Sequence, residues 1–179
     1  MHIPLFRRKP MLLLVAALSF LVFIIFSQQV MADMFSWFKK YDVHLSPAVQ
    51  GSITFDGKPL AGIKVFRELD YDKSYNDEAV TDELGRFNFA EKNIKSRQPG
   101  NKLDQSTIRQ VISLDYQGKT FVLWYTSTPS IEPHATFQRL LKALNCELTS
   151  AEEKFSLPNI EYPDFPHGVV SICQLDTSQ

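Results

Sequence analysis

The sequence predicts a mainly β protein, an antiparallel β-sandwich with one short helix in its C-terminal half and a hydrophobic helix at its N-terminus. Three observations support this fold class. Polar and apolar side chains alternate in runs of strand length across residues 49–89. Turn residues such as Asp56-Gly57 separate those runs. Apolar residues at helical spacing follow later, over residues 135–144.

The first 32 residues have the form of an export signal, with basic RRKP, an apolar run over residues 11–26 and polar SQQ before Val30-Met31-Ala32. As a helix of about 16 residues, that run spans roughly 24 Å, somewhat short of the ~30 Å hydrocarbon core of a bilayer. This favours cleavage before Asp33. An uncleaved signal-anchor and a translation start at Met34 stay open as alternatives. With either form of export, the protein is periplasmic or lies in the inner membrane with a periplasmic body.

Composition indicates one globular domain, expected over residues 48–179 after a linker over residues 33–47. Apolar residues make up 44% and charged residues 22% of the chain, enough to fill a core. Beyond residue 32 there remain 16 basic and 20 acidic residues, because the first 32 hold three cations and no acid. This acidic balance argues against nucleic acid as a partner.

The first predicted strand is residues 49–55, whose apolar side chains share one face. A turn at Asp56-Gly57 and a second strand over residues 63–69 are expected to form a hairpin. A polar loop over residues 70–77 follows. Its spacing of acidic and polar residues resembles the start of a calcium loop, but the glycine and glutamate that such a loop needs at its sixth and twelfth positions are missing.

A second turn precedes the next strand. Asp82 is expected to bind backbone groups of its own turn, and Gly85 to adopt a positive φ, so that Phe87 and Phe89 point inward.

The residues of this region resemble the transthyretin-like and carboxypeptidase-regulatory-like β-sandwich families. These families share a glycine-started strand, a D-G-x-P-L-x-G-x-x-V hairpin and a T-D-x-x-G-x-F-x-F return. The matching residues are Gly51, Asp56, Gly57, Pro59, Leu60, Gly62, Val65, Thr81, Asp82, Gly85, Phe87 and Phe89. The arrangement is also similar to an uncharacterised family of small bacterial proteins.

The resemblance implies a fold and little chemistry, because such sandwiches serve as accessory, adhesive and binding modules, as hormone carriers and as one hydrolase. The histidine-and-arginine site and the C-terminal signature of that hydrolase are not found here. The resemblance therefore argues against an enzyme.

The C-terminal half begins with a charged loop over residues 91–105 and a strand over residues 107–116. The next strand, FVLWYTST, is apolar on both faces and is expected at the centre of a sheet or under a cover. Alternation places Phe121, Leu123 and Tyr125 on one side of it. A covering helix is expected at about residues 135–144, although part of this segment could be strand.

The tail contains three prolines, which predict an irregular crossing before Gly168, and then a final strand, VVSICQL. The two cysteines, Cys146 and Cys173, are candidates for a disulfide in an oxidising compartment. Two buried thiols that never meet are the alternative. Without a CxxC motif, neither a zinc site nor a redox site is indicated.

No catalytic motif and no metal-ligand spacing occur in the sequence. The histidines His2, His44, His134 and His167 are dispersed, so no metal, cofactor or catalytic residue is predicted. Aromatic residues in the loops are more informative, because tyrosine combines a large contact area with a polar tip. The candidates for binding another protein are Tyr71, Tyr75, Tyr162 and Phe165.

These observations favour a non-catalytic binding protein, either periplasmic or membrane-anchored, that recognises another protein through its loops. A toxin-neutralising immunity protein is one concrete form. The alternatives are a structural or accessory subunit of an envelope assembly, and a transthyretin-related enzyme or small-ligand carrier. Residues 11–26 would contact the inner membrane if they are not cleaved.

Overall fold

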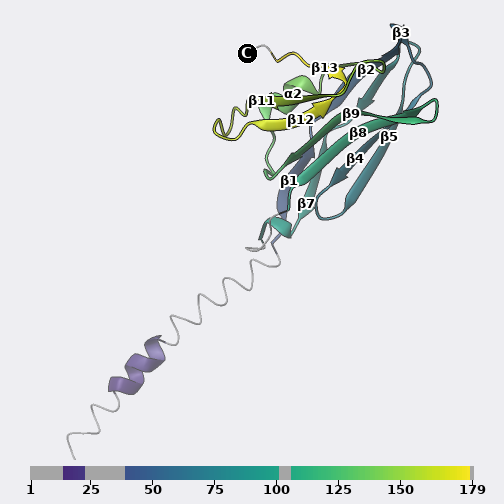
Figure 1. The fold of residues 1–179 in the computed structure, drawn as a ribbon. Coiled ribbons are helices and arrows are strands. Elements are labelled where there is room, and N and C mark those ends of the chain that lie inside the picture. The colour runs from purple at the N-terminus through teal and green to yellow at the C-terminus, as the bar shows by residue number, and fades with distance from the viewer. Residues whose placement is uncertain (1–13, 23–38, 101–105, 178–179) are drawn as a thin grey trace, which may run out of the picture.

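The computed structural model describes residues 14–22, 39–100 and 106–177 (Figure 1). Residues 14–22 form a helix, as predicted for the N-terminal hydrophobic segment. No helix among these described residues is both long and apolar enough to cross a membrane. The predicted cleavage site before Asp33 and the alternative start at Met34 lie outside the described residues.

Two large sheets form the body and confirm the predicted mainly β sandwich (Figure 1). A third sheet has two strands, β1, Tyr41–Ser46, and β7, Lys92–Ser96. In the six-stranded sheet the order is β11-β12-β9-β8-β4-β5, with strands Glu153–Leu157, His167–Ser171, Lys119–Thr128, Ile108–Tyr116, Lys64–Asp70 and Ser74–Val80. In the five-stranded sheet the order is β13-β10-β2-β3, and β6 also pairs with β2; the strands are Cys173–Gln174, Leu144–Glu147, Val49–Phe55, Lys58–Pro59 and Arg86–Phe89.

Apolar side chains from both sheets fill one core. β2 contributes Val49 and Ile53, which are fully buried, and β8 contributes Ile112 and Leu114 from the facing sheet. The α-helix α2, Ala135–Leu140, adds Phe137 to the same core. In β2 and β8 alternation therefore works as predicted, because each of these strands places its apolar face toward the other sheet.

The predicted hairpin between residues 49–55 and 63–69 is wrong. β2 pairs instead with the two-residue β3, and β4 belongs to the opposite sheet. Asp56 and Gly57, with φ of 51° and 72°, form the tight turn between β2 and β3. The chain then crosses between the sheets near Gly62, where φ is 74°. Pro59 lacks an N–H group, so it cannot donate a backbone hydrogen bond to a neighbouring strand as other residues do.

Three segments expected to be irregular are strands. The second half of the loop predicted over residues 70–77 belongs to β5, which pairs with β4 as a hairpin. The loop predicted over 91–105 contains β7, Lys92–Ser96, and the short 3-10 helix Gln98–Gly100. In the proline-rich tail, β11 pairs with β12. The sequence did not predict these strands because their composition is polar; β5 and β7 each expose one full face.

The folded body begins before the expected boundary at residue 48. Strand β1, Tyr41–Ser46, pairs with β7 and buries Val43 and Leu45. Together with Leu69 and Ile108 these residues form a second apolar cluster. The latter part of the predicted linker is therefore structural.

A β-bulge in β9 changes the predicted faces of that strand. Phe121 lies opposite Leu114, and Trp124 lies opposite Ile112, so Phe121 and Trp124 share the core face. Leu123 is the extra residue at the irregularity, which breaks strict alternation. The expectation that Tyr125 shares the face of Phe121 is therefore wrong, and Tyr125 is 37% exposed, whereas Leu123 is fully buried in the core. The central position of β9 in its sheet agrees with its apolar sequence.

The covering helix α2 is shorter than residues 135–144, because the chain turns after Leu140 and enters β10 at Leu144. β10 runs parallel to β2, whereas the other strand pairs of the described residues are antiparallel. The final strand is also divided. β12 lies in the six-stranded sheet and β13 in the five-stranded one, so the C-terminal segment joins both layers.

Candidate functional site

Two connections meet at one end of the six-stranded sheet. The first follows β9 and leads into α2, and the second, residues 158–166, joins β11 to β12. β12 pairs with β9 antiparallel, with Val169 opposite Thr126. The start of β12 therefore lies beside the end of β9, and both connections reach the same place.

The β11–β12 connection is held in shape from inside. Asn159 is buried; its side-chain amide donates to the Phe165 carbonyl at 2.9 Å and its side-chain carbonyl accepts from the Tyr162 N–H at 3.1 Å. The Phe165 N–H also donates to the Tyr162 carbonyl at 3.0 Å. Thr136 of α2 donates its hydroxyl to the Pro158 carbonyl at 2.6 Å. The loop is therefore a fixed feature with its aromatic side chains turned outward.

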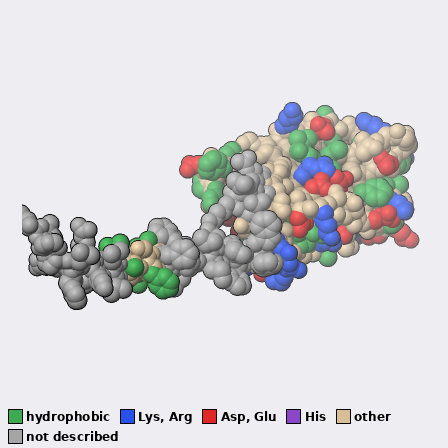
Figure 2. Space-filling model, turned by 90° about the horizontal axis from the view of Figure 1, so that it is seen from below, with side chains coloured by type: hydrophobic (Ala, Val, Ile, Leu, Met, Phe, Trp, Pro, Cys, Tyr) green, Lys and Arg blue, Asp and Glu red, His purple; other side chains and the backbone are tan. Residues whose placement is uncertain are grey.

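Between the two connections lies a pocket of about 550 Å³. Its lining residues are Ser127, Thr128, Pro129, Ser130, Ile131, Glu132, His134, Asn159, Tyr162, Phe165, Pro166, His167 and Gly168. His134 and His167 are buried, whereas Tyr162 and Phe165 are 55% and 73% exposed. Figure 2 shows hydrophobic and acidic side chains together at the left end of the body, where Figure 1 places the β11–β12 connection. The pocket thus joins a buried imidazole floor to an exposed aromatic rim.

At this floor His134 and His167 meet Glu161, an exposed residue that does not itself line the pocket; each of the three has one possible metal-ligand atom within 4.8 Å of the others. His134 Nδ1 lies 3.3 Å from Glu161 Oε2, and His134 Nε2 lies 3.4 Å from the Thr128 hydroxyl. The imidazole rings of His134 and His167 have centroids 4.5 Å apart. Both ring nitrogens of His134 thus have polar partners, whereas the buried Nε2 of His167 has no hydrogen-bond partner.

The electrostatics of the floor favour neutral imidazole next to carboxylate. Burial, together with the nearby His134, lowers the pKa of His167 to about 4, and Glu161 opposes this shift only in part. For Glu161, burial raises the pKa, but hydrogen bonds outweigh that effect and the net shift is downward. The strongest of these bonds comes from the Ala135 N–H, at 2.8 Å. At neutral pH His167 is therefore an uncharged base and Glu161 an anion.

The four predicted binding residues separate into two pairs. Tyr162 and Phe165 form the pocket rim. Tyr71 and Tyr75 do not line this pocket; they are half-buried against the second apolar cluster, next to the β4–β5 turn. The Tyr75 hydroxyl donates to Asp72 at 2.9 Å. Tyr71 lies in the turn and Tyr75 in β5, and both are only partly exposed, so their role in binding another protein stays a prediction.

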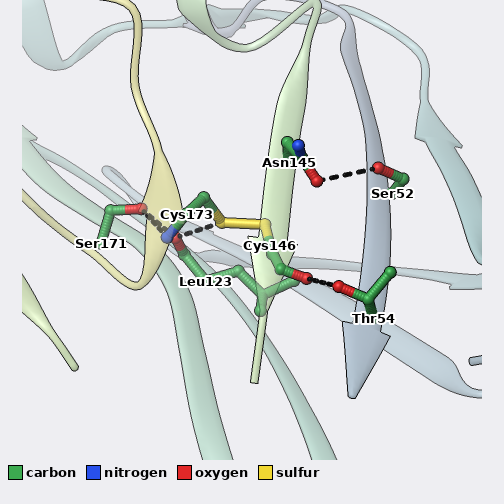
Figure 3. Close-up of a disulfide and its surroundings, with 7 residues drawn as sticks. All are labelled: Ser52, Thr54, Leu123, Asn145, Cys146, Ser171 and Cys173. Atoms are coloured by element: carbon green, nitrogen blue, oxygen red, sulfur yellow. Dashed lines mark hydrogen bonds between the residues drawn. A yellow bond between two sulfur atoms is a disulfide. The ribbon is translucent and has the colours of Figure 1, made fainter. Parts of the chain in front are cut away.

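Cys146 and Cys173 are joined by a disulfide between β10 and β13 (Figure 3). Both residues are buried. Ser171 accepts a hydrogen bond from the Cys173 N–H at 2.9 Å and donates to the Leu123 carbonyl at 2.6 Å. Cys173 Sγ lies 3.2 Å from the same carbonyl, a contact without a hydrogen bond because a disulfide sulfur carries no proton. This bridge lies in the core and contributes nothing to the pocket lining.

Sequence reasoning missed the polar floor. His134 and Glu161 come from the two connections and His167 from the start of β12, and their separations match no local ligand motif. The fold brings them together because β12 returns alongside β9. The prolines near these residues were one local signal, because proline restricts the backbone of a connection. Prolines do not indicate which side chains meet.

A family model described as "Domain of unknown function (DUF6795)" matches residues 49–151. The match runs from β2 to just past β10 and includes His134, whereas Glu161 and His167 lie beyond it. No curated protein and no solved structure matches the chain. The resemblance to the transthyretin-like families stays a prediction.

Proposed function

The chain belongs to the DUF6795 family, and from the geometry of its own pocket we propose that it is a non-catalytic binding protein of the cell envelope. Its partner is another protein, which it binds through the β11–β12 connection. One observation carries this proposal, the exposure of Ile160, Tyr162 and Phe165 on a single braced loop.

Apolar side chains exposed together on a fixed loop are costly in water and favourable at an interface. Ile160, Tyr162 and Phe165 are 57%, 55% and 73% exposed. Aromatic anchors beside a pocket, with a polar surround, are typical of the energetic centre of a protein interface. Because Asn159 fixes the loop before binding, little ordering entropy remains to oppose association.

The disulfide supports the proposed location. Disulfides persist in oxidising compartments such as the periplasm and are rare in the cytosol. The N-terminal apolar segment, which has the form of an export signal or anchor, supports the same location.

The test compares three forms of the full chain, expressed in their natural envelope and captured after mild cross-linking. They are the wild type, the double variant Tyr162→Ala/Phe165→Ala and the control Leu84→Ala. Leu84 is 53% exposed and lies in the β5–β6 turn, so its removal deletes apolar surface away from the pocket. We expect a protein whose recovery falls at least tenfold with the double variant and is unchanged with the control.

The proposal fails if no co-purifying protein distinguishes the double variant from Leu84→Ala. The intact mass of the purified chain, measured on the same sample, reports whether residues 1–32 are retained. Thermal unfolding of the three forms must agree closely, because the substituted side chains are exposed.

A second candidate function, small-ligand carriage, is favoured by the pocket itself. Its volume of about 550 Å³ lies in the range of small-molecule sites, and polar groups converge on its floor. Native mass spectrometry of protein purified from its own envelope would detect such a ligand as a fixed mass increment. That increment should disappear in Tyr162→Ala/Phe165→Ala if the ligand occupies this pocket.

A further inference from the structure

We propose that His134, Glu161 and His167 form a binding site for a transition-metal dication such as Zn²⁺, at the edge of the pocket that His134 and His167 line. This inference stands on the geometry of the three side chains and does not depend on the proposed protein partner. The three residues bring two imidazoles and one carboxylate together, a ligand set used by three-ligand zinc sites.

The spacing suits a single ion. Ligand atoms about 2.1 Å from a tetrahedral Zn²⁺ lie roughly 3.4 Å from one another. His134 Nδ1 and Glu161 Oε2 are already 3.3 Å apart, and the whole set falls within 4.8 Å. Small side-chain rotations would therefore close the set, and no backbone rearrangement is needed.

The unpartnered nitrogen of His167 is the independent observation that points to a ligand. His167 is 7% exposed, and its Nε2 is buried without a donor or acceptor. Leaving a buried polar group unpaired costs about 1–3 kcal/mol. The His134–Glu161 contact explains two members of the cluster as an ordinary hydrogen bond, but it gives no reason for a second imidazole beside them.

The surrounding contacts are those that orient metal ligands. Glu161 Oε1 accepts from the Ala135 N–H at 2.8 Å, which leaves Oε2 to face His134. The Thr128 hydroxyl lies 3.4 Å from His134 Nε2, so it can hold the imidazole tautomer that leaves Nδ1 free to bind metal. Such outer contacts commonly change metal affinity by about 10–100-fold.

The donor set also selects the class of ion. Imidazole suits zinc and neighbouring transition metals, whereas calcium and magnesium prefer all-oxygen ligands. Three protein ligands leave a fourth position for water or for a ligand group. Because His134 and His167 both line the pocket, that fourth position would open toward the space between the two connections.

The test is a metal titration of the purified, oxidised chain after removal of metal by a chelator. Zn²⁺ alone is titrated by calorimetry, and Co²⁺ alone is followed by its visible absorption, which reports four-coordinate geometry. The variants are Glu161→Gln, His134→Gln and His167→Gln, with Glu153→Gln as the control. Glu153 is an exposed glutamate on β11 and does not line the pocket.

We expect one Zn²⁺ per chain for the wild type and for Glu153→Gln, and at least a 100-fold loss of affinity in each of the three site variants. If the buried histidine variants fail to fold, Glu161→Gln decides alone, since its amide oxygen can still accept from Ala135. A wild type that binds Zn²⁺ no more tightly than Glu161→Gln overturns the inference, as does tight binding that no site variant weakens. No partner protein takes part, so this outcome is separate from that of the capture experiment.

Discussion

At the residue scale, the turn before β6 depends on one glycine. Gly85 has φ of 73°, and a Cβ placed there would lie 2.4 Å from the Ile53 carbonyl oxygen. Ile53 in turn donates its N–H to the Gly85 carbonyl at 2.9 Å. Asp82 supports the same turn by accepting from the Leu84 and Arg86 N–H groups. Positive φ and close backbone packing therefore coincide at Gly85.

Gly85→Ala is expected to destabilise the protein more than Gly57→Ala. Gly57 has φ of 72°, but a Cβ there meets nothing within 4 Å. Left-handed backbone costs about 1–2 kcal/mol for an alanine, and only Gly85→Ala adds a steric clash to that cost. Urea unfolding of both variants, followed by tryptophan fluorescence, measures the difference. Equal midpoints for the two variants would show that the clash is relieved by movement of the backbone.

Much of this turn was predictable from the residues alone, because aspartate and glycine have specific backbone preferences.

The burial of Arg67 was not predictable in this way. The alternation of β4 places it on the buried face, where it is 3% exposed. Its Nε donates to Asp77 at 3.1 Å, and Nη1 donates to the Ala90 carbonyl at 2.8 Å. A buried cation needs such partners. Asp77 comes from β5, a segment that the sequence presented as a loop, and Ala90 comes from the connection between β6 and β7.

At the scale of elements, Glu147 connects the end of β10 to the β2–β3 turn. Its carboxylate accepts from the Asp56 and Gly57 N–H groups and from the Thr54 hydroxyl, at 3.1, 3.0 and 2.8 Å. Thr149 adds its own N–H and hydroxyl. Partial burial raises the pKa of Glu147, but these donors outweigh it and lower the pKa to about 2.

Glu147→Gln is therefore expected to lose stability in a pH-dependent way. The amide would place N–H groups against groups that already donate, at a cost of about 2 kcal/mol near neutral pH. Because the folded pKa lies below the ordinary value of 4.5, the carboxylate stabilises the fold above that pH, and the effect is lost as pH falls toward 2. Denaturant unfolding of wild type and variant from pH 7 to pH 2 measures this convergence.

Glu153→Gln is the matched control, since its exposed side chain should give a nearly constant difference from wild type. A Glu147→Gln deficit that persists unchanged at pH 2 would indicate a packing defect and contradict the electrostatic explanation.

Element prediction succeeded where sequence periodicity reflects burial and failed where both partners are polar. β2, β8 and β9 carry apolar faces and were located well. β5 and β7 carry few apolar residues, and backbone pairing with β4 and β1 makes them strands. The sheet to which each strand belongs was not predictable from periodicity. The chain crosses from one sheet to the other between β3 and β4, and this crossing depends on packing against the facing sheet and not on the local sequence pattern.

At the scale of the whole molecule, the disulfide joins the end of the chain to its middle. Cys146 and Cys173 are 27 residues apart, and both are buried. Closing a loop of this size lowers the entropy of the unfolded chain and contributes about 3–4 kcal/mol. The bond also fixes β13 on the edge of the five-stranded sheet, next to β10.

Cys146→Ala/Cys173→Ala is expected to lower the free energy of unfolding by about 3 kcal/mol or more. Reducing agent should shift the unfolding midpoint of the wild type and leave that of the double variant unchanged. Thiol titration of the denatured wild type without reductant should find no free thiol. Two free thiols in that titration would contradict the bond.

The candidate site belongs to this largest scale, which explains why sequence reasoning found only its rim. Tyr162 and Phe165 are conspicuous as exposed aromatic residues in a proline-rich segment. His134 and His167 become neighbours only after β12 pairs with β9, and no local spacing records that pairing. Glu161 belongs to no motif in the sequence, although in the fold it faces His134.

The parallel pairing of β10 with β2 imposes an order of assembly. One edge of β2 is occupied by β3 and β6, which follow it closely, but its other edge is closed only by β10; the Ser52–Asn145 pair across that edge is separated by 93 residues. A chain that emerges N-terminus first, from a ribosome or through a membrane channel, must therefore hold an open strand edge until residues 144–147 arrive. Contacts of such long sequence separation form slowly, so this edge exposes newly made chains to mispairing or to a chaperone.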